Sequence, residues 1–349
     1  MVVLKSSYEK CQGCGGNLKF NPATQSLICK KCGAVEEFEK TKEASKHSIY
    51  NDTSKESHQK WLAENKVIQC ANCSAKIVLN NLEYAASCPY CGSEFVSVSE
   101  NLPGISPDKI IPFMFDEEEA VKRFKNSVKK KFYVPRPFKK NVVADNVKGI
   151  YIPSFAFDVN TSSSYNGTLS RTVRYVRNGK SYSRQEHFPI SGKINLLHQD
   201  VMVESSSKIN QNQLSEILPY NNKDCYDFDE NFIRGYGVEH YELDVKDCYS
   251  EAKKIINANI RRSILSKYSY NSVVRLEINT QYSNEVFLYK VSPIYKFNYV
   301  YKGKNYTTLM NGQTGKLGKG LPKSKIKVAF TVIGVILIIA AIILAIALL

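Results

Sequence analysis

The sequence has few of the residues and motifs on which enzymes commonly rely. It contains five histidines in 349 residues, and no pair of them has the i, i+4 spacing with glutamate that marks helical zinc-protease sites. The Gly-x-Ser-x-Gly motif of serine hydrolases is absent. The glycine-rich stretch 311–320 lacks both the glycine spacing and the Lys-Ser/Thr ending of a phosphate-binding loop. We therefore expect a non-enzymatic protein.

A signal peptide is also absent from the start of the sequence. Residues 1–10 contain no apolar run of the length that a signal peptide needs behind its basic start. We therefore expect the N-terminal region to stay in the reducing cytoplasm. Paired cysteines in that compartment are more often metal ligands than disulfides.

Eight of the ten cysteines form two copies of one module. In each copy a Cys-x-x-Cys pair is followed by a second such pair, and the segments between the pairs, 15–28 and 74–87, have the same length. Two such pairs, brought together by a hairpin, supply four thiolates to Zn²⁺ and leave no open position for a catalytic water. The sequence therefore predicts two structural zinc sites, held by Cys11, Cys14, Cys29 and Cys32 and by Cys70, Cys73, Cys88 and Cys91.

The residues between the cysteine pairs suit short hairpins. The strands are expected at 18–20 and 26–28 in the first module, and at 76–79 and 84–86 in the second. A glycine follows Cys14, Cys32 and Cys91, where such a metal-binding turn tends to need an unusual backbone angle. Ser74 occupies the corresponding position after Cys73.

The positive charge of the chain lies outside these modules. Residues 1–100 hold 12 lysines, no arginine and 11 acidic residues, a net charge of +1. Two four-thiolate zinc sites would lower this to about −3, which disfavours nucleic-acid binding by the modules. Basic stretches at 122–148 and 171–184 account for much of the excess elsewhere. They are either solvated faces that pair within the domain, or a surface for anionic lipid, an acidic partner or nucleic acid.

From about residue 99 the composition indicates a strand-rich α+β domain. Helices are expected after the Asp116 capping box and over 247–268. Strands are expected at 150–159, 172–177, 181–187, 272–280, 285–291 and 295–301, with Asn178-Gly179 as a hairpin turn. The two remaining cysteines, Cys225 and Cys248, are expected to be buried as small apolar residues.

A weak internal repeat runs through this domain. Pro153, Phe155, Phe157 and Val159 match Pro293, Tyr295, Phe297 and Tyr299 at an offset of 140. Ile111-Pro112-Phe113, before the first helix, resembles Leu218-Pro219-Tyr220, before the second. The repeat predicts two halves, each a helix with an antiparallel sheet.

The final segment of the chain, 328–349, carries no charge and is relieved only by Thr331 and Gly334. At about 1.5 Å per residue it can cross a hydrocarbon layer of about 30 Å, which predicts a single C-terminal membrane span and a tail-anchored protein. The positive-inside rule places the N-terminal region in the cytoplasm at the cell membrane. The lysines that precede the span are expected to lie near anionic lipid: Lys316, Lys319, Lys323, Lys325 and Lys327.

The order of these features resembles one known group. The double four-cysteine ribbon is followed by Ile111-Pro112-Phe113 before a glutamate-rich helix, then by 149–153, and then by 311–316 before a C-terminal span. In this combination the chain resembles zinc-ribbon membrane proteins of low-GC Gram-positive bacteria. The resemblance implies a non-enzymatic adaptor that acts with phage-shock-protein-A-type and membrane-scaffold proteins in envelope stress. Members are often labelled primosomal helicase or replisome organiser, but this chain resembles such helicases only in its cysteine pairs.

The expected organisation is therefore a zinc ribbon at 1–40, a charged linker at 41–66, a second zinc ribbon at 67–98, a cytosolic α+β domain at 99–322 and a transmembrane helix at 328–349. The expected function is a tail-anchored adaptor that recruits protein partners to the inner membrane face. The alternative is a membrane-tethered nucleic-acid-binding protein that uses the basic face of residues 122–184.

Overall fold

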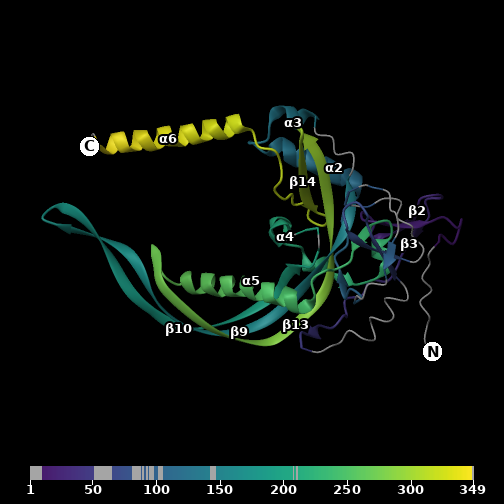
Figure 1. The fold of residues 1–349 in the computed structure, drawn as a ribbon, viewed down its shortest axis with the longest axis horizontal. Helices are drawn as coiled ribbons and strands as arrows, with labels where there is room; N and C mark the ends of the chain where they lie inside the picture. Colours follow the sequence, from purple (N-terminus) through teal and green to yellow (C-terminus); the bar gives the residue numbers. More distant parts are fainter. Residues whose placement is uncertain are drawn as a thin grey trace.

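The computed structural model describes residues 10–50, 65–80, 88, 90–91, 93, 98–100, 105–141, 147–206, 208–209 and 211–347. Within these residues the chain is a strand-rich α+β protein, as the sequence predicts, with two four-cysteine clusters and a C-terminal apolar helix. Figure 1 shows a curved arm of long strands, a helix lying in its concave side, and the C-terminal helix projecting from the opposite end of the body.

Two strands of 30 residues each form the centre of the fold. They are β9 (Lys148–Arg177) and β13 (Ser272–Tyr301), which pair antiparallel. β10 (Lys180–Glu204) returns along β9, and β14 (Lys304–Asn311) returns along β13. The sequence predicted shorter, separate strands here. It missed their continuity because the polar stretch 160–168 has no apolar alternation, yet β10 and β13 supply hydrogen bonds on both sides of it.

Both long hairpins close with two-residue turns. Asn178 and Gly179 have φ angles of 54° and 73°, which is the left-handed geometry of the predicted hairpin turn. Lys302 and Gly303 adopt nearly the same angles, 51° and 71°, between β13 and β14. The second turn was not predicted, because Lys-Gly is a weaker turn signal than Asn-Gly.

The predicted repeat is present as a pseudo-twofold arrangement. Ile152 pairs with Ser292 at a separation of 140, and the same offset relates the pairs on either side of this point to each other, as Pro153–Val291 and Tyr151–Pro293 show. Two short strands complete the symmetry: β8 (Lys109–Ile110) lies parallel to β13, and β12 (Gly237–Glu239) lies parallel to β9. Each half is therefore a short strand, a helix and a long hairpin.

The second half starts later than the sequence repeat suggested. Asp116 caps α2 (Glu117–Lys130) and Asp244 caps α5 (Val245–Leu265), and each carboxylate accepts the amide hydrogen three positions on at 2.8 Å. The two caps lie further apart in sequence than Ile111-Pro112-Phe113 and Leu218-Pro219-Tyr220, so the match of those two motifs was wrong. The latter motif belongs to an insertion that contains α4 (Gln211–Ile217), η1 (Asn222–Asp224), β11 (Tyr226–Asp227) and η2 (Glu230–Ile233).

The two helices cover the core of the body. α2 packs Phe124 against Phe297 of β13, with stacked rings 4.2 Å apart. The buried face of α5 packs against β9 and β10, and it includes Cys248, Ala252 and Ile256. Cys248 is thus buried, as predicted, whereas Cys225 is half-buried. The short helix α3 (Arg136–Asn141) follows α2.

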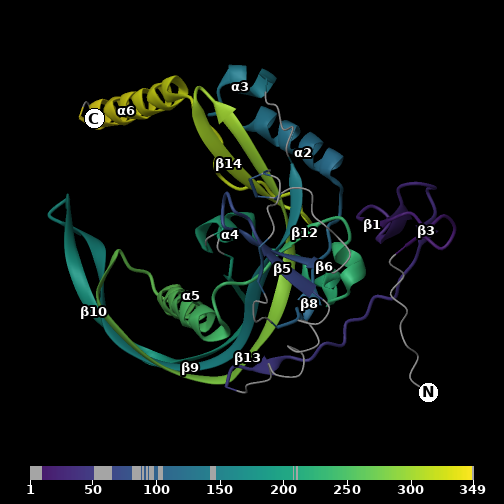
Figure 2. The same ribbon diagram turned by 45° about the vertical axis from the view of Figure 1, so that its right-hand side comes forward.

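The N-terminal modules join the body in different ways. In the first, β1 (Leu18–Asn21), β2 (Ser26–Cys29) and β3 (Val35–Glu36) form a separate three-stranded sheet. In the second, β5 (Asn65–Gln69) pairs with β6 (Lys76–Asn80) and with β7 (Val98–Glu100), and β6 also pairs with β12. Figure 2 shows β5 and β6 beside β12, so the second module extends the main sheet.

The first part of the predicted linker 41–66 packs against the α+β domain. β4 (His47–Ser48) pairs with β13, and the amides of Glu43 and Ala44 donate to the Asp227 carboxylate at 2.7 and 2.9 Å. The polar composition of this segment concealed these contacts, because they use backbone groups. Residues 51–64 of the linker and the predicted strand 84–86 lie outside the described residues.

Helix α6 (Lys325–Ala347) is the last described element. Its segment Lys325–Ile343 is long and apolar enough to cross a membrane, and none of that segment is buried against the rest of the described chain. A single-pass membrane protein is compatible with this helix.

Candidate metal centres

The structure brings together both predicted sets of four cysteines. In each set, all four Sγ atoms lie within 4.8 Å of one another. A tetrahedral Zn²⁺ with bonds of about 2.3 Å needs sulfurs about 3.8 Å apart. Four sulfur pairs come close to that value, at 3.5 to 3.7 Å: Cys11 with Cys32, Cys14 with Cys29, Cys70 with Cys91, and Cys73 with Cys88. Both clusters are therefore compatible with a bound metal ion.

The backbone of each metal-binding turn folds back on the first cysteine of its pair. The residues after the second cysteine, Gly15, Gly33 and Ser74, have φ angles of 66°, 76° and 56°. Their amides donate to the carbonyl of the first cysteine at 2.8 to 2.9 Å. The unusual angle expected from the glycines is therefore present, and Ser74 adopts it as well. Gly92 lies outside the described residues.

Backbone amides favour the thiolate form of Cys29, which a metal requires. The N–H groups of Cys32 and Lys31 lower the pKa of the Cys29 thiol to about 6. Cys29 is itself buried, at 1% exposure, while Cys32 is exposed. Each cluster therefore has a shielded side and a solvent-facing side, and four ligands close the metal's coordination sphere.

The first cluster is fastened to the body by aromatic rings. Phe20 of β1 meets Phe232 edge to face at 5.4 Å, and Phe38 meets the same ring at 4.9 Å. The Gln25 side chain donates to the Phe113 carbonyl at 2.8 Å. These contacts fix the ribbon against η2 and the strand region before α2.

The second cluster is fastened by a buried polar network. Tyr90, which lies between Cys88 and Cys91, donates its hydroxyl to Glu239 of β12. The Ser206 hydroxyl is 2.6 Å from both carboxylate oxygens of Glu239. The Lys296 ammonium lies 4.8 Å from the centre of the Tyr90 ring. The metal site and the central sheet are thus joined through side chains that no pattern in the sequence had grouped.

Lys296 also supplies positive charge next to the second cluster. Burial lowers the pKa of its ammonium, and three nearby thiolates act in the opposite direction: Cys73, Cys88 and Cys91. The alternation around Lys296 could have placed it on the sheet face opposite Tyr295 and Phe297. The alternation could not have shown that Lys296 lies beside a metal site in the N-terminal part of the chain.

A second buried carboxyl group, that of Glu204, lies near this network. Its surroundings make the folding stability of the chain depend on pH. Burial, and then the charge of Glu239, raise the pKa of Glu204 well above its usual range. Its Oε1 accepts from the Ser205 and Ser206 amides at 3.1 and 2.8 Å. Its Oε2 has no hydrogen-bond partner among the residues that the structure describes. The folded chain therefore keeps this proton at pH values where the unfolded chain has released it.

We accordingly expect the free energy of unfolding to fall as the pH rises above the ordinary glutamate range. Glu204→Gln should remove up to about 1.4 kcal/mol per pH unit of this slope and should stabilise the chain at pH 8. Urea unfolding of the detergent-solubilised chain at pH 5, 6.5 and 8 measures the effect. Glu118→Gln, at an exposed position of α2, is the matched control. Equal slopes for wild type and Glu204→Gln would contradict the assignment.

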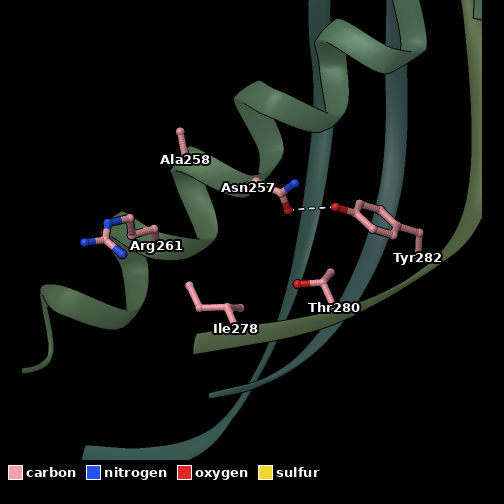
Figure 3. A pocket seen from close by; sticks show the side chains of 6 residues that line it. All are labelled: Asn257, Ala258, Arg261, Ile278, Thr280 and Tyr282. Carbon is pink, nitrogen blue, oxygen red and sulfur yellow. Dashed lines mark hydrogen bonds between the residues drawn. The ribbon is translucent and has the colours of Figure 1, made fainter. Parts of the chain in front are cut away.

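A cavity of about 450 Å³ lies between α5 and β13 (Figure 3). Its lining contains one charged group, Arg261, together with Asn257, Ala258, Ile278, Thr280 and Tyr282. The Tyr282 hydroxyl donates to Asn257 Oδ1 at 2.7 Å across the opening. This lining contains no carboxylate, histidine or thiol.

The five lysines before the apolar helix have different surroundings. Lys316 donates to the Leu218 carbonyl, and Lys319 pairs with Glu216 at 3.7 Å. Lys327 donates to the Phe132 and Val134 carbonyls at 2.7 and 3.2 Å. The remaining two, Lys323 and Lys325, are exposed. Part of the predicted lysine set thus also contacts the body of the protein.

The predicted basic face of residues 122–184 is divided in the structure. Its first part lies on α2 and α3, whereas 171–184 form the distal tip of the β9–β10 hairpin, at the far end of the arm (Figure 1). The length of the hairpin separates them, and that length was not foreseen from the sequence. The two stretches are therefore two surfaces.

No protein-family model matches the chain, and no solved structure matches it significantly. Among curated proteins it is similar to the "Uncharacterized protein YdjG" of Bacillus subtilis (strain 168). The two are 28% identical over 322 residues, which cover 92% of this chain and 91% of that protein. The sequence similarity therefore extends over nearly the whole of both chains.

Proposed function

We propose that the chain is a non-enzymatic membrane adaptor, anchored by α6 and carrying its ribbons and α+β body on the cytoplasmic face of the cell membrane. The observation that carries this proposal is the apolar segment Lys325–Ile343, none of which is buried among the described residues. Side chains such as Phe330 and Leu337 are 71% and 64% exposed. Such a surface is unfavourable in water and is stabilised in a bilayer. The lysines next to it favour the cytoplasmic orientation.

We further propose that both clusters bind Zn²⁺ as structural sites. Four thiolates at tetrahedral spacing suit this ion, and they leave no position for substrate or water. The metal would fix each ribbon in shape while its exposed turn, with Cys32 in one ribbon and Cys91 in the other, faces the solvent and its partners. This arrangement supports a binding role for the ribbons rather than a chemical one.

Membrane fractionation tests the anchor. We expect the full chain to stay in the membrane fraction through a high-salt and alkaline wash, because burial of the apolar helix does not depend on ion pairing. A chain truncated after residue 322 is expected in the soluble fraction. Protease should reach the body in inverted vesicles but not in intact protoplasts. Release of the full chain by the wash, or digestion in protoplasts, would contradict the anchor or its orientation.

The partner class rests on the family resemblance and needs its own test. We propose phage-shock-protein-A-type and membrane-scaffold proteins as partners in envelope stress. Affinity capture of the full chain from cross-linked, detergent-solubilised membranes should recover them, and a chain lacking residues 1–40 should recover less. Recovery of replication proteins in their place would favour the second candidate function.

The second candidate is a membrane-tethered nucleic-acid-binding protein, favoured by the tip of the β9–β10 hairpin. Tyr175 and Tyr182 are exposed there and stack at 5.7 Å. The register places Arg177, Lys180 and Arg184 on the same face of the hairpin as these tyrosines, whereas Arg174 lies on the opposite face and Arg171 pairs with Glu186 at 2.9 Å. Aromatic and basic groups in this combination suit single-stranded nucleic acid. Binding that weakens steeply with salt, and that Tyr175→Ser with Tyr182→Ser abolishes, would support this candidate.

A further inference from the structure

The corner between α2 and α3, residues 129–140, exposes an aromatic pair. Phe132 and Tyr133 are 65% and 41% exposed, and their rings meet edge to face at 5.3 Å. The neighbouring apolar residues Val134 and Phe138 are buried at 3% and 4% exposure. Val134 and Phe138 therefore pack the corner against the core, while the rings of Phe132 and Tyr133 stay exposed.

This corner contacts the start of α6 (Figure 1). The Ser324 amide donates to the Tyr133 carbonyl at 2.8 Å, and the Lys327 ammonium donates to the Phe132 carbonyl at 2.7 Å. The same ammonium lies 5.1 Å from the centre of the Phe132 ring. Wherever α6 enters a bilayer, these contacts hold the corner at the level of the lipid headgroups.

The corner and the start of α6 also concentrate positive charge. The Lys327 ammonium donates to the Val134 carbonyl at 3.2 Å, two residues before Arg136, and the Lys139 ammonium donates to the Lys129 carbonyl at 2.8 Å within the same corner. The N-terminal end of α6 adds the positive end of its helix dipole. Neither 121–141 nor 317–349 contains an acidic residue. The compensating negative charge must therefore come from outside these two segments.

We propose that the α2–α3 corner is a second membrane-contact surface, at which Arg136, Lys139 and Lys327 bind the phosphates of anionic lipids while Phe132 and Tyr133 enter the interfacial layer. Aromatic rings favour this layer, and basic side chains near it are attracted to anionic headgroups. The inference rests on the proposed function, because it needs α6 in the bilayer. It adds a specific docking geometry that holds the body against the membrane.

The test uses the full chain in nanodiscs made with either phosphatidylglycerol or phosphatidylcholine. A photoactivatable phosphatidylglycerol should cross-link to peptides from 129–141, and amide exchange there should be slower in the anionic discs. Arg136→Gln and Lys139→Gln should each reduce the cross-linking yield by about fivefold, the effect of about 1 kcal/mol for each charge removed. Phe132→Ser with Tyr133→Ser should abolish the protection from exchange.

The hairpin tip supplies the matched control. Tyr175→Ser with Tyr182→Ser removes another exposed aromatic pair from a basic surface, and it should leave cross-linking at the corner unchanged. Metal content and circular dichroism confirm that each variant folds. Equal exchange in both lipids, or cross-links confined to the hairpin tip, would overturn the inference while leaving the anchor intact. A chain that does not remain in the discs would overturn the anchor and the inference together.

Discussion

Cys29→Ser is expected to lower the zinc content from two ions per chain to one and to unfold the first ribbon. The Cys29 thiol is buried, and the ribbon sheet beside it has only three short strands. Metal binding contributes on the order of 10 kcal/mol to the folding of such a site, far more than one hydrogen bond or surface ion pair does. Metal analysis of the purified full chain measures the stoichiometry, and amide exchange of β1 and β2 measures the local unfolding.

Cys88→Ser should also remove one ion, but its effect should reach further. The second ribbon shares the β6–β12 pairing and the Tyr90–Glu239 hydrogen bond with the body. We therefore expect faster amide exchange in β12 as well, whereas Cys29→Ser should leave β12 protected. Cys225→Ser is the control, since this half-buried thiol lies outside both clusters and two ions should remain bound. A wild-type chain with fewer than two ions would contradict the double site.

Phe113→Ala is expected to reduce the free energy of unfolding by about 3–5 kcal/mol, as large-to-small changes in a packed core do. Phe113 is fully buried, and three rings surround it at 4.4 to 4.9 Å: Tyr151, Tyr236 and Tyr295. A Cβ at Gly149 or Gly312 would come within 3.1 Å or less of this ring, so the chain packs backbone directly against it. Urea unfolding of the solubilised full chain measures the loss.

The pseudo-twofold arrangement provides a control for this change. Tyr241 precedes the Asp244 cap by the same number of positions as Phe113 precedes the Asp116 cap. It contacts Phe155 as Phe113 contacts the related Tyr295. Tyr241 is only half-buried, so Tyr241→Ala should cost clearly less. Equal losses would show that burial does not distinguish the two halves and would contradict the role given to Phe113.

The features predictable from the sequence are those whose signal is local. The cysteine pairs, the Asp116 cap, the Asn178-Gly179 turn and the apolar tail each carry their information within a short stretch of chain. Close spacing restricts the geometry so strongly that little else in the chain can override it. The offset of 140 was visible as well, because both copies keep alternating aromatic residues on the buried face of a strand.

The features that escaped prediction depend on partners distant in sequence. Polar residues such as Ser162 and Ser164 form strand because β10 and β13 flank them, and not because of their own pattern. The second ribbon joins β12, and Lys296 lies beside its thiolates, only through contacts between the N-terminal and C-terminal parts of the chain. Context of this kind decides strand formation more often than propensity does.

The pairing of β9 with β13 also determines when the body can fold during synthesis of the chain. Its register runs from Ser170 with Ser272 to Lys148 with Lys296, so every pair joins positions far apart in sequence. While the ribosome is still producing α5, the β9–β10 hairpin has an unpaired edge that is open to aggregation. β13 and β14 complete the body, and only the short segment 312–324 separates β14 from α6. The body can therefore close only as the apolar helix is being made, so with the proposed anchor, folding and membrane insertion fall within the same short interval of translation.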